Sequence, residues 1–367
     1  MSLDVRIKKS FGDYTLDVAF AAGDETLGFL GASGCGKSLT LRCIAGIETP
    51  DEGRIVVNGK VFFDSEQKIN LTPQQRKTAL LFQNYMLFPN LTVADNIGAG
   101  IGREVPKAER ERIISEELER FGLRGFGQRY PAQLSGQQQR VALARMLAAR
   151  PGILMLDEPF SALDSHLKGV LEQNLVSLFD AFEGTILYVS HDIDESLRFC
   201  DRIAVVDAGR IVEMDAGREL VNRPQSVAGL KLSGCKNAPA AVYAGPHAVH
   251  VPPWGIDVHT AQEVPRDVKC LGLCAFYVER AEGPGENCYR VRVDRVSDAR
   301  FERMALLGFL DRDDADGAAV AFEANEMSYL HQHMFWRVSM REGVALPEVG
   351  EKLWVRIPPD KVYLVSR

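Results

Sequence analysis

Long hydrophobic runs are missing from this chain of 367 residues. None approaches the roughly 18–20 consecutive apolar residues that a membrane-spanning helix needs, so any role at a membrane would depend on a partner. An excess of basic charge is missing as well, because 43 Lys and Arg oppose 50 Asp and Glu, for a formal net charge of −7. Since nucleic acids attract basic surfaces, this balance argues against nucleic-acid binding as the main role.

Paired cysteines are also lacking. The seven cysteines are an odd number, and no two of them form a CxxC pair. Disulfide frameworks and zinc sites need cysteines at close, repeated spacings. We therefore expect reduced thiols, and Cys270 and Cys274 are too isolated to predict a zinc site. The opening residues alternate polar and apolar side chains without a central apolar segment, so we expect no signal peptide.

The first part of the chain has the pattern of an α/β protein. Residues 25–30 predict a buried strand, and a helix is expected from Ser38 through about Ala45. Asn58-Gly59 lies between two apolar runs, which predicts a β-hairpin. Residues 106–123 place apolar side chains on one face of a helix and opposite charges on the other.

Two short apolar runs, 152–159 and 185–192, each end in polar residues. This is typical of central parallel strands whose carboxyl ends carry the functional groups. A last hairpin is expected to close this part near residue 215.

The second part begins after a stretch of small residues at 231–245. Beyond it, apolar and polar residues alternate, as in 289–296 and 352–365, which predicts strands, with one helix expected near 300–309. We therefore predict an α/β domain over residues 1–232 and a small β-rich, barrel-like accessory domain over residues 233–367.

Residues 31–38 read GASGCGKS and match the pattern GxxxxGK[ST] in full. In such a phosphate-binding loop (P-loop) the glycines let backbone N–H groups wrap the phosphates, the lysine reaches the β- and γ-phosphates, and the last hydroxyl can ligate Mg²⁺. The predicted strand before it and helix after it fit this reading. The loop consists of Gly31, Ala32, Ser33, Gly34, Cys35, Gly36, Lys37 and Ser38.

Polar side chains at the ends of the two central strands are the next candidates. Asp157 and Glu158 follow one apolar run and His191 follows the other. With a P-loop upstream, Asp157 is expected to hold the Mg²⁺ shell and Glu158 to polarise a water in line with the γ-phosphate. His191 is expected to contact the γ-phosphate or the attacking water.

Gln83 follows another apolar run and could reach Mg²⁺ or water. The four residues after Asn84 are Tyr85, Met86, Leu87 and Phe88. They either fill the core or form a groove for a partner helix, since Met and aromatic residues suit such surfaces.

The P-loop, Gln83, LSGQQ at 134–138, LMLDEP at 154–159, SALD at 161–164 and His191 occur in the order and approximate spacing of the ATP-binding-cassette ATPases. Over about residues 1–230 the chain resembles that family. The resemblance implies a P-loop NTPase cassette with a mixed-sheet core, an antiparallel β subdomain and a helical subdomain. It also implies ATP and Mg²⁺ as cofactors and a head-to-tail dimer with a second copy of the chain.

The resemblance implies a role for each matching residue. Glu158 would be the general base, His191 the switch histidine and Gln83 the lid glutamine. Ser135, Gly136 and the helix N-terminus behind them would close on the ATP held by the other copy, and Asp164 would help join the two sites. Gln137 departs from the family's usual glycine, and slower turnover is the expected consequence.

The aromatic that stacks on adenine is either Phe11 or Tyr14, and spacing does not choose between them.

The second domain narrows the resemblance to importer ATPases with an oligonucleotide-binding-like module, most similar to those for molybdate. Sulfate, tungstate and other small-solute importers share much of this plan. The expected partners are integral permease subunits and, indirectly, a solute-binding protein, which would place the chain at the cytoplasmic face of the membrane. The acidic stretch 311–326 argues against nucleic acid as a ligand of this domain.

Other readings remain for comparison. Chromosome and repair cassettes carry long coiled coils between the P-loop and the signature, which is LSGQQ at 134–138 here, and this chain lacks such coiled coils. A ribosome-type protein would pair two cassettes in one chain. A soluble cassette ATPase outside transport is therefore the lesser alternative. Arg290, Arg292 and Arg295 could serve a regulatory oxyanion site, but a solvated strand face is the favoured reading. His331 and His333 are assigned no role.

Overall fold

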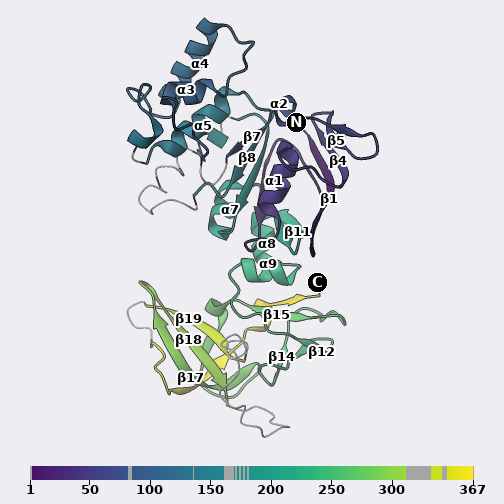
Figure 1. Cartoon of the computed structure of the whole chain (residues 1–367). Coiled ribbons are helices and arrows are strands. Elements are labelled where there is room, and N and C mark those ends of the chain that lie inside the picture. The colour runs from purple at the N-terminus through teal and green to yellow at the C-terminus, as the bar shows by residue number, and fades with distance from the viewer. Residues whose placement is uncertain are drawn as a thin grey trace. The chain divides into compact units, whose positions relative to one another are not determined.

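The computed structural model describes residues 2–81, 85–134, 136–160, 182–310, 332–340 and 345–366, together with 169, 172, 175, 176, 178 and 179. Its chain forms two compact units, Met1–Arg218 and Glu219–Arg367, which are described separately (Figure 1).

The described residues of the first unit form an eleven-stranded mixed sheet in the order β6-β5-β4-β1-β2-β11-β10-β3-β9-β8-β7. The strands β10, β3, β9, β8 and β7 are parallel neighbours, whereas the strands from β6 to β2 are antiparallel. The bounds are β1 (Leu3–Phe11), β2 (Tyr14–Ala22), β3 (Thr26–Leu30), β4 (Glu52–Val57), β5 (Lys60–Asp64), β6 (Ile69–Asn70), β7 (Ala79–Leu81), β8 (Ile153–Asp157), β9 (Thr185–Ser190), β10 (Arg202–Asp207) and β11 (Arg210–Ala216).

The central strands confirm the expectation from sequence. Every residue of β3, β8 and β9 is buried, because both faces of this part of the sheet are covered. The Asn58-Gly59 hairpin is confirmed as well, with Val57 paired to Lys60 and φ of 51° and 77° at the two turn residues. Two successive positive φ angles are what a two-residue type I′ turn requires.

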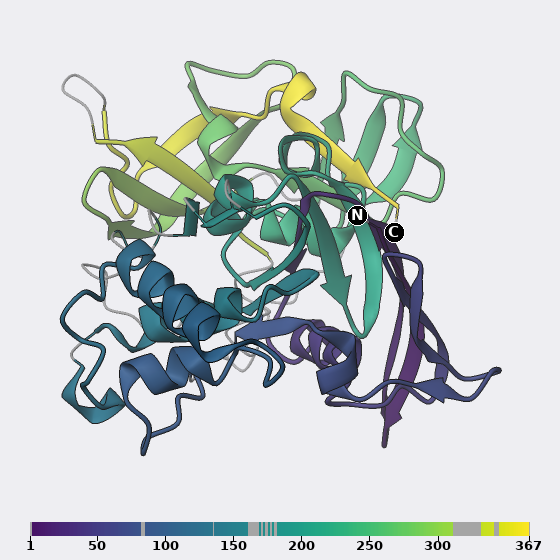
Figure 2. The same ribbon diagram turned by 90° about the horizontal axis from the view of Figure 1, so that it is seen from above.

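Helices cover the sheet at one end. A group formed by α3, α4 and α5 lies on the β7–β8 side, and the antiparallel strands lie on the opposite side (Figures 1 and 2). The predicted charged helix is α4, with Ile113 and Phe121 buried and Ile114 and Leu118 half-buried. In the first unit and the segment that follows it, the helices are α1 (Lys37–Ala45), α2 (Pro73–Arg76), α3 (Val93–Gly98), α4 (Lys107–Arg120), the 3₁₀ turn η1 (Pro131–Gln133), α5 (Gln138–Ala148), α7 (Ile193–Phe199), α8 (Gly217–Asn222) and α9 (Val227–Leu232).

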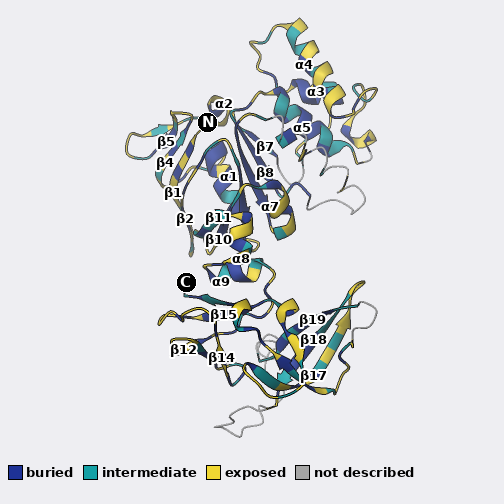
Figure 3. Ribbon diagram, turned by 180° about the vertical axis from the view of Figure 1, so that it is seen from behind, coloured by how far each residue is buried: buried dark blue, intermediate teal, exposed yellow. Residues whose placement is uncertain are grey.

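The apolar residues of this unit form two clusters. One lies around α1 and the strands β1–β5, and the other joins α3, α4 and α5 to β7, β8 and β9. The dark central strands in Figure 3 lie between them. The carboxyl ends of β3, β8 and β9 are thereby fixed against one another, and these ends carry the predicted functional residues.

The described residues of the second unit are β-rich, as predicted. They form sheets of order β12-β13-β14, β15-β21 and β16-β20-β17-β18-β19. The strands are β12 (Val242–Gly245), β13 (Ala248–Val251), β14 (Ile256–His259), β15 (Cys270–Leu273), β16 (Glu279–Ala281), β17 (Cys288–Asp298), β18 (Glu302–Phe309), β19 (Met334–Ser339), β20 (Lys352–Arg356) and β21 (Val362–Val365), with the 3₁₀ turns η2 (Ala275–Tyr277) and η3 (Pro359–Lys361).

The prediction of a helix near residues 300–309 is wrong. These residues form β18, which is hydrogen-bonded on both edges, to β17 and to β19. Its run Ala305–Leu307 is buried, so the pairing and packing of a central strand outweigh the helix preference of the local sequence. The compact units divide at Arg218/Glu219, so α9 groups with the second unit although the sequence places it before the boundary at 232/233.

Candidate active site

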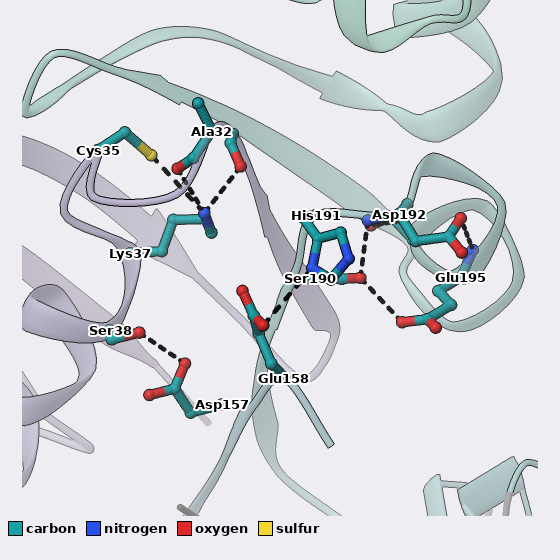
Figure 4. Close-up of polar contacts among 12 residues, drawn as sticks. Ala32, Cys35, Lys37, Ser38, Asp157, Glu158, Ser190, His191, Asp192 and Glu195 are labelled. Atoms are coloured by element: carbon teal, nitrogen blue, oxygen red, sulfur yellow. Dashed lines mark hydrogen bonds and ion pairs between the residues drawn. The ribbon is translucent and has the colours of Figure 1, made fainter. Parts of the chain in front are cut away.

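The loop after β3 folds around its own lysine. The Lys37 side chain is only 4% exposed. Its Nζ donates hydrogen bonds to the carbonyl oxygens of Gly31 at 2.7 Å and Ala32 at 2.9 Å (Figure 4). The ammonium group is thus held at the centre of the loop by acceptors that phosphate oxygens can replace.

Glycine is required in this loop by geometry. At Gly36, φ is +109°, and an added Cβ would lie 2.3 Å from the Tyr14 hydroxyl oxygen. At Gly31 an added Cβ would lie 2.3 Å from the carbonyl oxygen of Val206. Glycine is therefore needed at these two positions for the loop to fit between β2 and β10. Glycine also lets the backbone approach a bound ligand closely.

Ser38 and Asp157 come together from α1 and β8. The Ser38 hydroxyl donates to Asp157 Oδ1 at 2.7 Å. Burial raises the pKa of the Asp157 carboxyl, while this hydrogen bond opposes the rise. Hydroxyl and carboxylate oxygens are ligands that Mg²⁺ prefers, and a cation here would offset the cost of the buried carboxylate. The pair therefore fits the implied metal.

Glu158 and His191 meet across the ends of β8 and β9. Glu158 Oε2 lies 3.5 Å from Nδ1 of His191, and the backbone N–H of Glu158 donates to the carbonyl of Val189 at 3.0 Å. Glu158 has φ of 46°, which is unusual for a residue other than glycine and is found at functional sites. Figure 4 shows the side chains of Glu158 and His191 turned toward each other.

A buried carboxylate supports the His191 turn. Glu195 Oε2 accepts hydrogen bonds from the Ser190 hydroxyl at 2.8 Å and from the Tyr188 hydroxyl at 3.2 Å. The Ser190 oxygen in turn accepts from the backbone N–H of Asp192, and the Asp192 side chain caps α7. These residues were not among the candidates predicted from the sequence, although Asp192 and Glu195 have the spacing of a helix-capping pair.

The two candidate aromatics differ in exposure. Phe11, at the end of β1, is 47% exposed, and the Lys9 ammonium lies 5.2 Å from its ring centre. The Tyr14 hydroxyl is buried near Gly36 and has no hydrogen-bond partner among the described residues. Phe11 therefore exposes part of its ring to solvent, whereas Tyr14 packs under the P-loop.

The signature region begins α5. Gly136 has φ of 75°, and Gln137 is the N-cap residue of the helix and is half-buried. Ser135, Gln83 and Asp164 lie outside the described residues.

The apolar segment 85–88 divides between the two roles considered for it. Tyr85 and Leu87 pack against the helical core, whereas Met86 and Phe88 are 54% and 48% exposed. The exposed pair lines a groove of about 570 Å³. The groove is completed by Thr78, Ala79, Leu87, Ala99, Gly100, Arg145, Met146 and Ala149.

In the second unit, Arg290, Arg292 and Arg295 are exposed on β17, which agrees with a solvated strand face. His333 pairs with Asp294 at 3.0 Å, and His331 lies outside the described residues. All seven cysteines are free. Among the described residues no group of three or more His, Cys, Asp or Glu side chains is arranged to hold a metal ion.

Residues 16–161 match the protein family described as ABC transporter. The chain is 43% identical to a sulfate/thiosulfate import ATP-binding protein of Gloeobacter violaceus over 60% of its own length and 64% of that relative. It is 39% identical to a molybdenum import ATP-binding protein of Paramagnetospirillum magneticum, over 60% and 61%. The chain therefore spans less than two thirds of these two relatives. Over 94% of its length it is 34% identical to an Fe(3+) ions import ATP-binding protein of Rhizobium meliloti, of which it covers 85%.

A solved structure agrees with the fold. It is a dimeric ATP-binding cassette in a post-hydrolysis state bound to ADP and Pi, which matches 59% of this chain and 99% of its own with a TM-score of 0.50 and 30% identity. Of the helices in the described part of the chain, none has the length and apolar character needed to cross a membrane. The match over residues 16–161 and the extended identity to the third relative show that this chain belongs to the ABC transporter family.

Proposed function

We propose that the chain hydrolyses ATP as the energy-coupling subunit of a membrane importer. The observation that carries this proposal is the convergence of Lys37, the Ser38–Asp157 pair and the Glu158–His191 pair at the carboxyl ends of β3, β8 and β9. The relatives, which are named import ATP-binding proteins, support it.

The chemistry follows from the positions of these groups. Lys37 would exchange the carbonyls of Gly31 and Ala32 for the β- and γ-phosphates of ATP. Ser38 and Asp157, with Gln83 as a further ligand, would hold Mg²⁺, which supplies charge neutralisation to the phosphates when it is bound. Glu158 would accept a proton from the attacking water, and His191 would orient that water or the γ-phosphate.

A second copy of the chain would complete each site. Ser135, Gly136 and Gln137 at the start of α5 would meet the ATP held by the other copy, with Asp164 near the junction. The exposed Gly136 and the helix N-terminus suit an arriving phosphate. The solved cassette that resembles this chain is described as a dimer, which supports a two-fold arrangement.

The groove lined by Met86, Phe88 and Arg145 would receive a helix of an integral permease subunit. Two exposed apolar side chains beside a cation are suited to a short amphipathic helix. This partner would hold the chain at the cytoplasmic face of the membrane, and a solute-binding protein would act through the permease. Residues 233–367 would form the accessory domain.

The solute that we propose is an oxyanion, with molybdate first. The molybdenum-import relative supports this choice, and sulfate is the alternative, which the sulfate/thiosulfate-import relative supports at 43% identity. The Fe(3+)-import relative, which matches 94% of this chain, makes ferric iron a third solute to test.

The test is uptake of labelled molybdate, sulfate and ferric iron by cells whose only copy of the protein carries Glu158→Gln. Loss of molybdate uptake alone is the expected result. Loss of sulfate or iron uptake instead would keep the transport role and replace the solute. Unchanged uptake of all three would contradict the oxyanion assignment.

A further inference from the structure

Arg145 of helix α5 holds the groove segment Tyr85–Phe88 by two hydrogen bonds. Arg145 Nη1 donates to the carbonyl of Met86 at 2.8 Å, and Nη2 donates to the carbonyl of Tyr85 at 2.9 Å. Its guanidinium also lies 5.4 Å from the ring centre of Phe88. One side chain therefore contacts three of the four residues of the segment.

The backbone of this segment explains why an arginine is needed. Tyr85 and Met86 have φ of 58° and 45°, and two successive left-handed residues that are not glycine are strained unless their surroundings hold them. The planar fork of a guanidinium can bind two carbonyl oxygens at once in fixed geometry, whereas a lysine ammonium cannot reproduce that fork.

The other end of α5 is hydrogen-bonded to the residues that follow β8. Gln139 is 1% exposed, and its Nε2 donates to the carbonyl of Pro159 at 2.7 Å. Its Oε1 accepts from the Tyr85 hydroxyl at 3.4 Å. Pro159 directly follows Glu158. Tyr85 and Met86, at the start of the segment, are thus connected through α5 to the residue next to the proposed general base.

We propose that Arg145 and Gln139 are positioning residues that make α5 a rigid connection between the Tyr85–Phe88 segment and the end of β8, so that a change in the groove is transmitted to Glu158. This inference rests on the proposed function and adds to it the residues that link the groove to the nucleotide site. An α-helix suits the task because its internal hydrogen bonds let it move as one body.

The first test compares hydrogen–deuterium exchange of Arg145→Met, Arg145→Lys and the unmodified full chain. Without nucleotide, loss of two charged hydrogen bonds should raise exchange in peptides covering residues 85–92 by about tenfold in Arg145→Met. Arg145→Lys should restore part of the protection. With MgATP, the unmodified chain should show altered exchange in the same peptides, and Arg145→Met should lose that response.

The matched control is Arg110→Met. Arg110 of α4 also donates to backbone carbonyls, those of Gly98 at 2.7 Å and Gly102 at 2.9 Å. The substitution Arg110→Met removes a similar set of hydrogen bonds from the helical part and leaves the contacts of residues 85–88 in place. Unchanged exchange of residues 85–92 in Arg145→Met, or an equal rise in Arg110→Met, would overturn the proposal.

A kinetic measurement tests the other end. Gln139→Leu should lower kcat for ATP hydrolysis with little change in KM, because it disturbs the Pro159 carbonyl next to Glu158 and leaves the P-loop intact. A rise in KM at constant kcat would overturn the role given to Gln139. Absence of hydrolysis by the unmodified chain would instead overturn the proposed function, and the nucleotide-free exchange data would still decide whether Arg145 holds the segment.

Discussion

The carboxylate of Glu158 lies 3.5 Å from the imidazole of His191, although the two residues follow different strands, β8 and β9. The His191 side chain is 63% exposed and that of Glu158 is 24% exposed. A water or phosphate oxygen can therefore approach both groups from solvent, while the backbone of each is held by β8 and β9. This relationship leads to the first prediction.

Glu158→Gln should preserve ATP binding and abolish most of the hydrolysis. Removing a general base typically lowers kcat by about 10²- to 10⁴-fold, and the amide keeps the shape of the side chain. The variant should therefore accumulate as an ATP-bound dimer. Steady-state hydrolysis, nucleotide binding and light scattering with ATP measure the three effects. A variant that hydrolyses ATP at the normal rate, or that stays monomeric with bound ATP, would contradict the assignment.

Lys37→Met should weaken ATP binding severely. Lys37 supplies the ammonium group that the loop carbonyls of Gly31 and Ala32 hold in place. A charged hydrogen bond of this kind contributes roughly 1.5–3 kcal/mol, or at least about tenfold in affinity. Calorimetry with ATP provides the measurement. The control is Lys60→Met, which loses a surface bond to the Gln75 carbonyl at 2.8 Å. Equal affinities of the two variants would exclude the role given to Lys37.

Asp157→Asn should stabilise the nucleotide-free protein at neutral pH. Burial raises the folded-state pKa of Asp157 above its ordinary value of 3.8, so the folded protein binds the proton more tightly than the unfolded chain does. Ionisation of the Asp157 carboxyl therefore lowers the free energy of unfolding as the pH rises above 3.8 and through the raised folded-state pKa. We expect a gain of about 1 kcal/mol, or roughly 2–4 °C in Tm, at pH 7. The gain should shrink as the pH is lowered toward 3.8.

The control for this prediction has the opposite sign. The hydrogen bond from Lys9 lowers the pKa of Asp51 below its ordinary value of 3.8. The ionised Asp51 therefore stabilises the fold above pH 3.8, and this contribution is lost as the pH falls through the lowered pKa. Asp51→Asn should therefore lower Tm at pH 7, whereas Asp157→Asn should raise it. Thermal melts from acid to neutral pH measure both. A difference between Asp157→Asn and the unmodified protein that does not depend on pH would refute the burial argument.

Phe11→Ala should raise the Kd for ATP, whereas Tyr14→Phe should leave it nearly unchanged. Stacking of a base on an aromatic ring contributes roughly 1–3 kcal/mol, at least about fivefold in affinity. Tyr14→Phe removes only a hydroxyl that is buried without a partner among the described residues, so it should also leave the fold intact or stabilise it. Titration with ATP and with a triphosphate lacking a base separates stacking from phosphate binding. A loss of affinity confined to Tyr14 variants would reverse the choice.

The central sheet and much of the site could be predicted because their signals are local. Buried strands that end in polar residues, the glycine pattern of the P-loop and the Asn58-Gly59 turn each follow from a few neighbouring residues. Long-range packing was less accessible. The segment Glu302–Phe309 has the composition of a helix, and only its two neighbouring strands make it β18.

The supporting contacts of the site were not predictable for the same reason. Arg145 and the carbonyl of Tyr85 are 60 positions apart, and no periodicity in the sequence indicates that they meet. Glu195 was within reach of prediction, since its spacing from Asp192 indicates a helix cap. Its bond to the Ser190 hydroxyl depends on how α7 packs against β9.

The backbone conformation of Glu158 is unfavourable for a glutamate, although its carboxylate is needed for the proposed chemistry. Glycine and asparagine adopt a φ of 46° at a lower energetic cost than glutamate does. The glutamate therefore stands at a position where another residue would stabilise the fold more. Screens that select only for thermal stability would tend to replace Glu158. The most stable version of this fold would then be an inert one, and the need to retain the glutamate limits how far the molecule can be stabilised at this point.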